Sequence, residues 1–227
     1  MEKALKHRHR GAIGAATLIT ASAMAIAPVS AAELELSFYG GYQGAAHSQI
    51  SGTDPGGAGA FDLVAGWEGK SFSMPPYWGA RATWWQENNW GFGVEITHAK
   101  VYADAGTRAA TGFTRLEFTD GLNIVTVNAL RSFAPMGRFT PYLGGGVGLS
   151  IPHVDISSAG GTTLGYQLAG PAVMWMAGAS YQINDRWSAF AEYKGSYSIN
   201  SVTLGSGGTL DTNIVTSALD VGFSIRF

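Results

Sequence analysis

The chain ends in Ala218-Leu219-Asp220-Val221-Gly222-Phe223-Ser224-Ile225-Arg226-Phe227. Every odd-numbered position of this stretch holds a large apolar side chain, and every even-numbered position holds a polar or small one. Successive side chains of a β-strand point to opposite faces, so one face of such a strand is wholly apolar. This alternation is typical of strands that contact lipid on one side and a polar interior on the other. The stretch therefore predicts a membrane-spanning β-strand.

The composition of the whole chain favours the same class of protein. The 227 residues are 46% apolar and 12% aromatic, and they include 32 glycines but only 13% charged residues. That charged fraction is about half the usual share of a soluble domain. The absence of cysteine excludes a disulfide framework, a Cys-ligated zinc site and thiol catalysis. The net charge of −2 provides no basic surface for nucleic acid.

The first 32 residues have the features of a secretory signal peptide. Four of the first ten residues are Lys or Arg, an uncharged run follows from Gly11 to Val29, and small residues close it at 30–32. A basic region, an apolar region and a small-residue cleavage site are the three parts of such a signal. We predict cleavage after Ala31 or Ala32, with a single transmembrane anchor as the less favoured alternative.

Alternating apolar and polar residues, separated by turn-rich breaks, divide the remaining chain into eight segments. The predicted strands cover about 33–46, 75–86, 90–104, 116–133, 139–156, 166–183, 187–203 and 213–227. Short turns at 87–89, 134–138 and 184–186 alternate with longer connections at about 47–74, 105–115, 157–165 and 204–212. Tight periplasmic turns and longer outer loops are typical of outer-membrane barrels. We therefore predict an all-β, eight-stranded antiparallel up-and-down transmembrane barrel over 33–227, with both termini periplasmic and four outer loops.

The alternation also predicts which side chains point into the barrel. The charged residues of this interior set are Glu35, Arg81, Glu95, Glu192, Lys194, Asp220 and Arg226. An eight-stranded barrel is just wide enough to be filled by its own side chains, which favours a structural network of ion pairs. A proton path or a narrow pore is the alternative. Near the short turns, four tryptophans are predicted to form the inner aromatic girdle: Trp84, Trp85, Trp90 and Trp187.

Sequence motifs of soluble enzymes are absent. Gly144-Gly145-Gly146-Val147-Gly148 lies within a strand pattern and has no following helix or lysine, so it does not predict a phosphate-binding loop. These glycines are better interpreted as space for barrel curvature or for a bulky neighbour. No His-x-x-x-His pair, Walker, Rossmann or Gly-x-Ser-x-Gly element is present.

Polar residues whose side chains can transfer protons or bind metals gather at the predicted outer ends of the strands. All three histidines that follow the signal peptide, His47, His98 and His153, fall there. Imidazoles beside carboxylates bind metals or exchange protons, although rim histidines are equally often ordinary loop residues. In the long first connection, 61–76 is rich in aromatic residues, Met and Pro, and would cover the barrel mouth or touch outer-leaflet lipid.

The mature chain resembles the outer-membrane β-barrel family of lipid A oxidases over nearly its whole length, and the resemblance is most specific in several short stretches. They are Gly66-Trp67-Glu68-Gly69, Arg81-Ala82-Thr83-Trp84-Trp85, 98–104, 116–123, Pro152-His153-Val154 and Glu192-Tyr193-Lys194-Gly195. The departures lie in loop lengths. The terminal Phe227 also resembles the signal by which such barrels are assembled. The resemblance implies residence in the outer membrane of a Gram-negative bacterium, contact with lipid A and the barrel assembly machinery, and a monomeric state. No nucleic-acid partner is expected.

The resemblance further implies an enzyme that oxidises the proximal glucosamine of lipid A to an aminogluconate unit with dioxygen as co-substrate. It supplies no catalytic residues, so the candidate site is inferred from the rim. Candidate catalytic residues are His98, His153, Glu117, Asp120 and Glu68; candidate substrate-binding residues are Lys100, Trp67 and Tyr102; and a hypothetical metal set is His47, His98 and His153. The cofactor would be a divalent or redox metal or an organic group, whose identity the sequence leaves open, and a redox metal or organic group would accept the electrons.

A second function class stays open at this point. A small barrel without enzymatic activity would provide envelope stability, adhesion or narrow porin-like conductance. The rim histidines and the chemically varied first connection favour the lipid A-modifying oxidoreductase, whereas the lack of a redox motif favours the non-enzymatic barrel.

Overall fold

A computed structural model describes residues 33–227, so the predicted signal peptide lies outside the described residues. The strands and the helix are β1 Glu33–Ala45, β2 Ser48–Asp54, β3 Gly59–Ala65, β4 Trp67–Glu68, β5 Trp78–Trp85, β6 Trp90–Ala103, α1 Ala105–Thr111, β7 Arg115–Ser132, β8 Phe139–Ser158, β9 Gly161–Tyr166, β10 Gly170–Gln182, β11 Trp187–Thr203 and β12 Thr209–Arg226. Among the described residues, no helix is long and apolar enough to cross a membrane.

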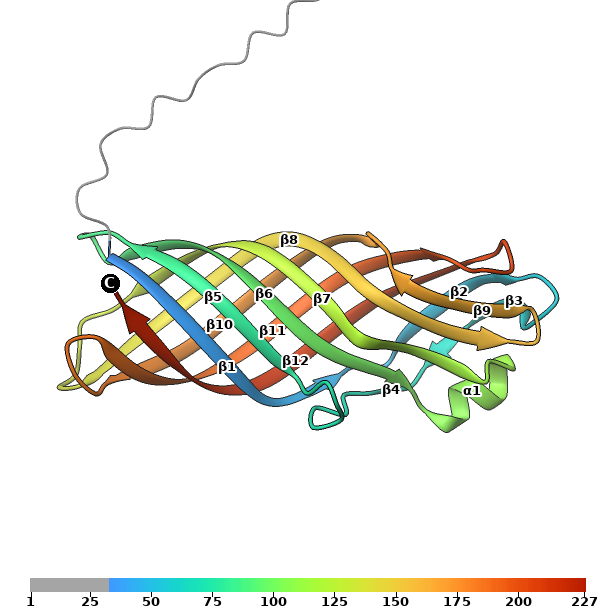
Figure 1. Cartoon of the computed structure of the whole chain (residues 1–227), viewed down its shortest axis with the longest axis horizontal. Helices are drawn as coiled ribbons and strands as arrows, with labels where there is room; N and C mark the ends of the chain where they lie inside the picture. Colours follow the sequence, from blue (N-terminus) through green and yellow to red (C-terminus); the bar gives the residue numbers. More distant parts are fainter. Residues whose placement is uncertain (1–32) are drawn as a thin grey trace, which may run out of the picture. The chain divides into compact units, whose positions relative to one another are not determined.

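Eight of these strands form a closed antiparallel ring. The order is β1-β5-β6-β7-β8-β10-β11-β12, and β1 pairs with β12 to close it, for example through Phe38 opposite Phe223 (Figure 1). The start of β1 and the end of β12 lie at the same end of the ring. The ring strands match the eight segments predicted from the sequence, which confirms the fold class.

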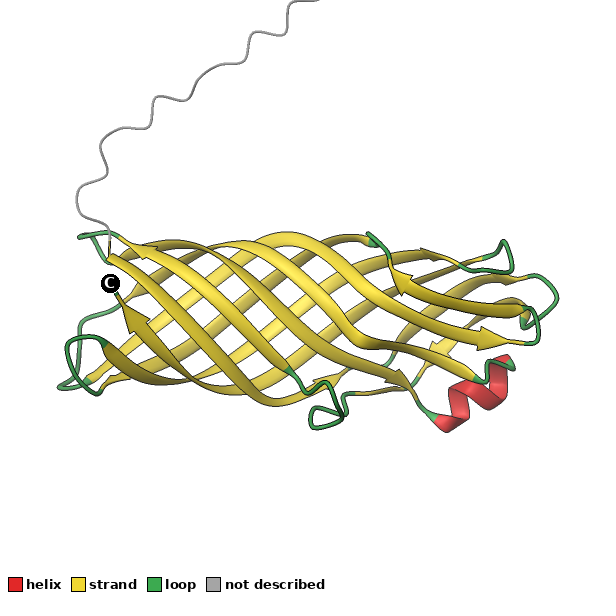
Figure 2. Cartoon of the chain, viewed as in Figure 1, coloured by secondary structure: helices red, strands yellow, loops and turns green. Residues whose placement is uncertain are grey.

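The outer end of the ring carries structure that the sequence pattern did not reveal. The predicted loop 47–74 contains a β2–β3 hairpin, which pairs with β12, and the short β4, which pairs with β6. β9 adds to β8, and α1 replaces part of the loop predicted at 105–115. The extra strands and α1 gather at one end of the barrel (Figure 2).

The helix within residues 33–227, α1, has a capped start. Asp104 is its N-cap, and its carboxylate accepts a 2.7 Å hydrogen bond from the Thr107 amide. This bond, together with one from the Thr107 hydroxyl, holds the pKa of the Asp104 carboxyl below its usual value. Gly112 ends the helix in the left-handed region, with φ of 80°.

A belt of exposed apolar side chains surrounds the other part of the ring. Phe38, Val127 and Phe223 are each about 60% exposed, and their inward neighbours along each strand are buried. An apolar surface that continues around a closed ring matches the lipid-facing band of a membrane barrel. Of the four predicted girdle tryptophans, Trp84, Trp90 and Trp187 are exposed on this face.

The prediction is wrong for Trp85, which lies inside the barrel and not in the girdle. It continues the inward series of Arg81 and Thr83, and it packs against the cluster formed by Leu130, Tyr142 and Met176 inside the barrel. The strict alternation of the strand therefore outweighs the tendency of tryptophan to lie at the membrane interface.

Ion pairs fill the interior at the level of the belt. Arg81 lies 2.8 Å from Glu192 and 3.2 Å from Glu95, and Lys194 contacts both carboxylates as well as Asp220. All five side chains are buried. Glu35 and Arg226 form a separate 2.8 Å pair at the end of the barrel where the chain terminates.

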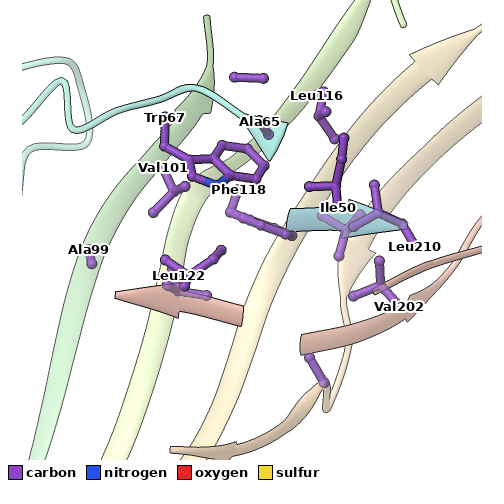
Figure 3. Packing of buried hydrophobic residues seen from close by; sticks show 14 of the residues in the cluster. Ile50, Ala65, Trp67, Ala99, Val101, Leu116, Phe118, Leu122, Val202 and Leu210 are labelled. Carbon is purple, nitrogen blue, oxygen red and sulfur yellow. The ribbon is translucent and has the colours of Figure 1, made fainter. Parts of the chain in front are cut away.

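The interior changes character toward the outer end. There it is an apolar core, built from the ring, the β2–β3 hairpin and β4 (Figure 3). Trp67, Phe118, Leu122 and Ile50 lie in it and are at most 5% exposed. We call this part of the interior the outer core.

Candidate functional site

The outward face of β6, β7 and β8 changes from apolar to polar along the strands. On β7, Val127 and Val125 belong to the exposed belt, whereas Asn123 and Glu117 follow on the same face toward the outer end. Three neighbouring strands align at this level: Trp78 of β5 pairs with His98 of β6, and His98 pairs with Asn123 of β7. A polar patch at the edge of an apolar belt lies where lipid headgroups meet a membrane barrel.

A bulge in β7 shapes this patch. On one side Val101 pairs with Phe118 and Ala99 with Leu122, so residues 119–121 face Lys100 alone. On the other side Phe118 pairs with Val154 and Leu122 with Pro152, so the same three residues face His153 alone. Gly121 adopts φ of 93°, a conformation that side chains rarely allow. Bulges redirect side chains and are frequent beside active sites.

The bulge places Asp120 beside His153. The Asp120 carboxylate lies 3.7 Å from His153 Nδ1, too far for a hydrogen bond but close enough for an ion pair when the imidazole is protonated. The Tyr166 ring on β9 contacts the same imidazole, with ring centroids 4.8 Å apart. The structure thus brings together two of the candidate catalytic residues, one on each of two neighbouring strands.

His98 has the most constrained environment of the three histidines. The indole of Trp78 stacks on it at 5.8 Å, and His98 is only 5% exposed. A Cβ atom at Gly121 would collide with the imidazole, so this position requires glycine.

The hydrogen bonds around Asn123 define the tautomer of His98. The Asn123 amide nitrogen donates to the backbone carbonyls of Asp120, Gly121 and Ile151, so its oxygen faces His98. His98 Nδ1 lies 2.9 Å from that oxygen and must be the protonated nitrogen of the neutral ring. Nε2 then carries the lone pair, and it is buried without a hydrogen-bond partner among the described residues. An imidazole in this state is a proton acceptor.

The remaining polar residues on this face form ion pairs and cation–π contacts. Arg115 lies 2.8 Å from Asp155 and 3.2 Å from Glu117. Lys70 lies 3.2 Å from Glu68 and over the Tyr102 ring at 4.7 Å. Lys100 is fully buried, with its ammonium 5.4 Å from the centre of the same ring. We call the residues that face outward around the bulge the wall cluster: His98, Tyr102, Glu117, Asp120, Asn123 and His153.

Two candidate residues lie elsewhere. Trp67 is buried in the outer core, where it packs near Phe118 and donates a 2.8 Å hydrogen bond to Ser48. His47 is exposed on the connection between β1 and β2. Within residues 33–227, no group of three or more His, Asp or Glu side chains is arranged to hold a metal ion.

Sequence reasoning missed the residues that organise the site. Asn123, Gly121 and Trp78 control the position of His98, yet none of them is a typical catalytic residue. Asn123 and Gly121 lie within the stretch 116–123 that carries part of the family resemblance, and that resemblance was the available signal.

Comparison with known proteins supports the fold alone. Neisserial surface protein A has a TM-score of 0.50 and 16% identity, covering 87% of this chain and 98% of its own. The outer membrane protein AlkL, solved in lipid bilayers, has a TM-score of 0.50 and 13% identity, covering 96% and 97%. No protein-family model and no curated protein matches the sequence. The chain therefore has the fold of small outer-membrane β-barrels.

Proposed function

We propose that this protein resides in the outer membrane of a Gram-negative bacterium and oxidises the proximal glucosamine of lipid A. The observation that carries the proposal is the His98–Asn123 pair, a buried proton acceptor of defined tautomer on the outward wall. Lipid A sugars lie at headgroup height in the outer leaflet. A site on the outward wall, at the edge of the apolar belt, would reach them without drawing the lipid into the barrel.

The reaction requires a base and an acceptor of two electrons. In a substrate with a free anomeric hydroxyl, the anomeric carbon would lose a proton and two electrons, and its hydroxyl would lose a second proton, giving a lactone. Water then opens the lactone to the aminogluconate. Dioxygen takes up both electrons and both protons to form hydrogen peroxide, and the oxygen atom that the product gains comes from the water that opens the lactone.

The chain's own residues would carry out the proton transfer. His98 Nε2 would accept the hydroxyl proton, and Asn123 would hold the ring in the required tautomer. Trp78 covers the imidazole and is 39% exposed, so its indole would move aside when the sugar binds. The Asp120–His153 pair on the other side of the bulge would carry the second proton.

The described residues do not fit a metal held by three histidines. His98 uses Nδ1 for Asn123, and His47 belongs to a different connection. We therefore do not propose the three histidines as metal ligands.

Purified protein and lipid A with a free anomeric hydroxyl, incubated in detergent under air, test the proposal. Mass spectrometry should show the gain of one oxygen atom, and peroxide should form in equal amount. His98→Gln should lower the rate by about 10²–10⁴-fold, the usual contribution of a general base. His47→Gln is the matched control and should retain the rate. Unchanged lipid A with the intact protein would instead favour the non-enzymatic barrel.

A further inference from the structure

The connection between β4 and β5 is held to the barrel at Ser71 and at Tyr77. The Ser71 hydroxyl donates to the Gln43 carbonyl at 2.9 Å and accepts from the Gln43 amide at 2.8 Å. Tyr77 is buried and donates through its hydroxyl to Asp220 at 3.1 Å. The Tyr77 amide also donates to the Ser71 carbonyl at 2.7 Å, which joins the two ends. Only residues 72–76, between these two held positions, project from the barrel wall. We call this segment the β4–β5 loop.

The tip of the β4–β5 loop is apolar and exposed. Phe72 is 76% exposed and Met74 is 83% exposed, which makes Met74 the most exposed large apolar side chain of the described residues. The segment Phe72-Ser73-Met74-Pro75-Pro76 contains no charged residue. In water such a tip would be unfavourable, because neither side chain gains from contact with the rest of the protein.

The loop leaves the wall at the edge of the lipid-facing belt. Trp78 follows the loop after Tyr77 and is the first residue of β5, at the level where the outward face changes from apolar to polar. Lys70 precedes the loop and lies among the polar residues Glu68 and Tyr102. The loop projects away from the barrel at this level rather than across its end (Figure 1). Its apolar surface is therefore continuous with the belt, and its charged base is continuous with the headgroup side.

We propose that the β4–β5 loop inserts Phe72 and Met74 into the outer leaflet, between the acyl chains next to the headgroups. The occupant is membrane lipid, because the loop continues a surface that already faces lipid. The pinned ends at Ser71 and Tyr77 hold the apolar tip outward, and Lys70 at the base would face lipid phosphate. This inference requires only that the barrel spans a membrane, and it does not depend on lipid A oxidation.

Site-directed spin labelling tests the loop directly, since the chain has no cysteine to remove. Phe72→Cys and Met74→Cys would each carry a nitroxide in barrels reconstituted into phosphatidylcholine vesicles. Phe223→Cys on the belt is the lipid reference, and Ala110→Cys, exposed on α1, is the aqueous reference. Heat-modifiable electrophoretic mobility would confirm that each labelled variant is folded.

Relaxation by oxygen reports lipid exposure, and relaxation by a water-soluble nickel complex reports water exposure. The ratio of the two at positions 72 and 74 should approach that at position 223 and exceed that at position 110 severalfold. A ratio equal to that at position 110 would overturn the proposal. Shielding from both reagents would also overturn it, since that result would place the tip over the barrel mouth.

Discussion

The two halves of this barrel have opposite polarity. Within the apolar belt, the outside is Val, Leu and Phe, and the inside holds Arg81, Glu95, Glu192, Lys194 and Asp220. Beyond the belt the inside is apolar, with Phe118 and Leu122 in the outer core, while the outside carries ion pairs such as Arg115 with Asp155. The same strands, among them β6, β7 and β8, run through both halves.

The difference shows how the surrounding medium decides which face of a strand is polar. In the belt, lipid accepts apolar side chains, so charges are confined to the interior and must be paired there. Beyond it, water surrounds the barrel, and the hydrophobic effect favours an apolar interior as in a soluble protein. The wall cluster lies on the outward face just beyond the line where the two regimes meet.

The largest effect is expected from breaking the charge network in the membrane half. Arg81→Met should destabilise the barrel by about 3–5 kcal/mol, because the buried carboxylates of Glu95, Glu192 and Asp220 would be left to share a single cation, Lys194. Urea unfolding in detergent micelles, followed by tryptophan fluorescence, would measure this loss. Adding Glu192→Gln should recover part of it, whereas strictly additive effects would show that the two residues are not coupled.

A buried leucine of the outer core tests the other half. Leu122→Ala should cost about 3 kcal/mol through lost burial and the cavity that remains. Hydrogen exchange should show the loss as weaker protection of β2 and β3, while the belt region keeps its protection. Leu149→Ala on the lipid-facing side, where the side chain is 46% exposed, is the matched control. An equal cost for Leu149→Ala would mean that the outer core is not a packed core.

One strand allows the boundary to be tested on a single face. β12 carries Asp211 on its outward face beyond the belt and Val221 on the same face within it. Val221→Asp should destabilise the barrel by about 2 kcal/mol and slow its insertion, because a carboxylate would face lipid. Thr209→Asp, also outward but beyond the belt, should have little effect on heat-modifiable folding. Normal folding of Val221→Asp would contradict the assignment of the belt.

The smallest effect concerns the cap of α1 in the outer half. The folded-state pKa of Asp104 is depressed by its hydrogen bonds to Thr107, so its contribution is present above the unfolded pKa and is lost as the pH falls through the folded pKa. Protease cleavage within α1 should therefore increase under acidic conditions. Asp104→Asn keeps a capping side chain and should remove the pH dependence. A cleavage rate of the unsubstituted protein that does not change with pH would exclude this role of Asp104.

The ring strands could be predicted because each alternates with a period of two residues. That periodicity identified the segments and the inward positions of Arg81 and Lys194, and it depends only on local geometry. The β2–β3 hairpin was not predicted, since its strands are short, and since it is held by pairing with β12 and by burial of Ile50 and Phe61. Such contacts between distant segments leave no periodic pattern.

The candidate site was predictable only in its residue types. His98, His153 and Asp120 stood out as ionisable residues near strand ends. The bulge that separates Asp120 from the regular ladder depends on pairing with both neighbouring strands, and a single sequence does not show register. The roles of Asn123 and Trp78 follow from that register as well.

β12 is shared by both halves of the barrel, and this has a consequence for the order of assembly. Its residues from Thr216 to Arg226 seal the ring against β1, and those from Thr209 to Thr212 hold the β2 edge of the hairpin. The last strand of the described chain thus meets its first strand, and these contacts join nearly the most distant positions in it. Contacts of such long range form slowly, because the chain must first close a large loop. Until β12 pairs, the barrel would therefore have two unpaired strand edges, that of β1 in one half and that of β2 in the other. The pairing of β12 alone would close both edges.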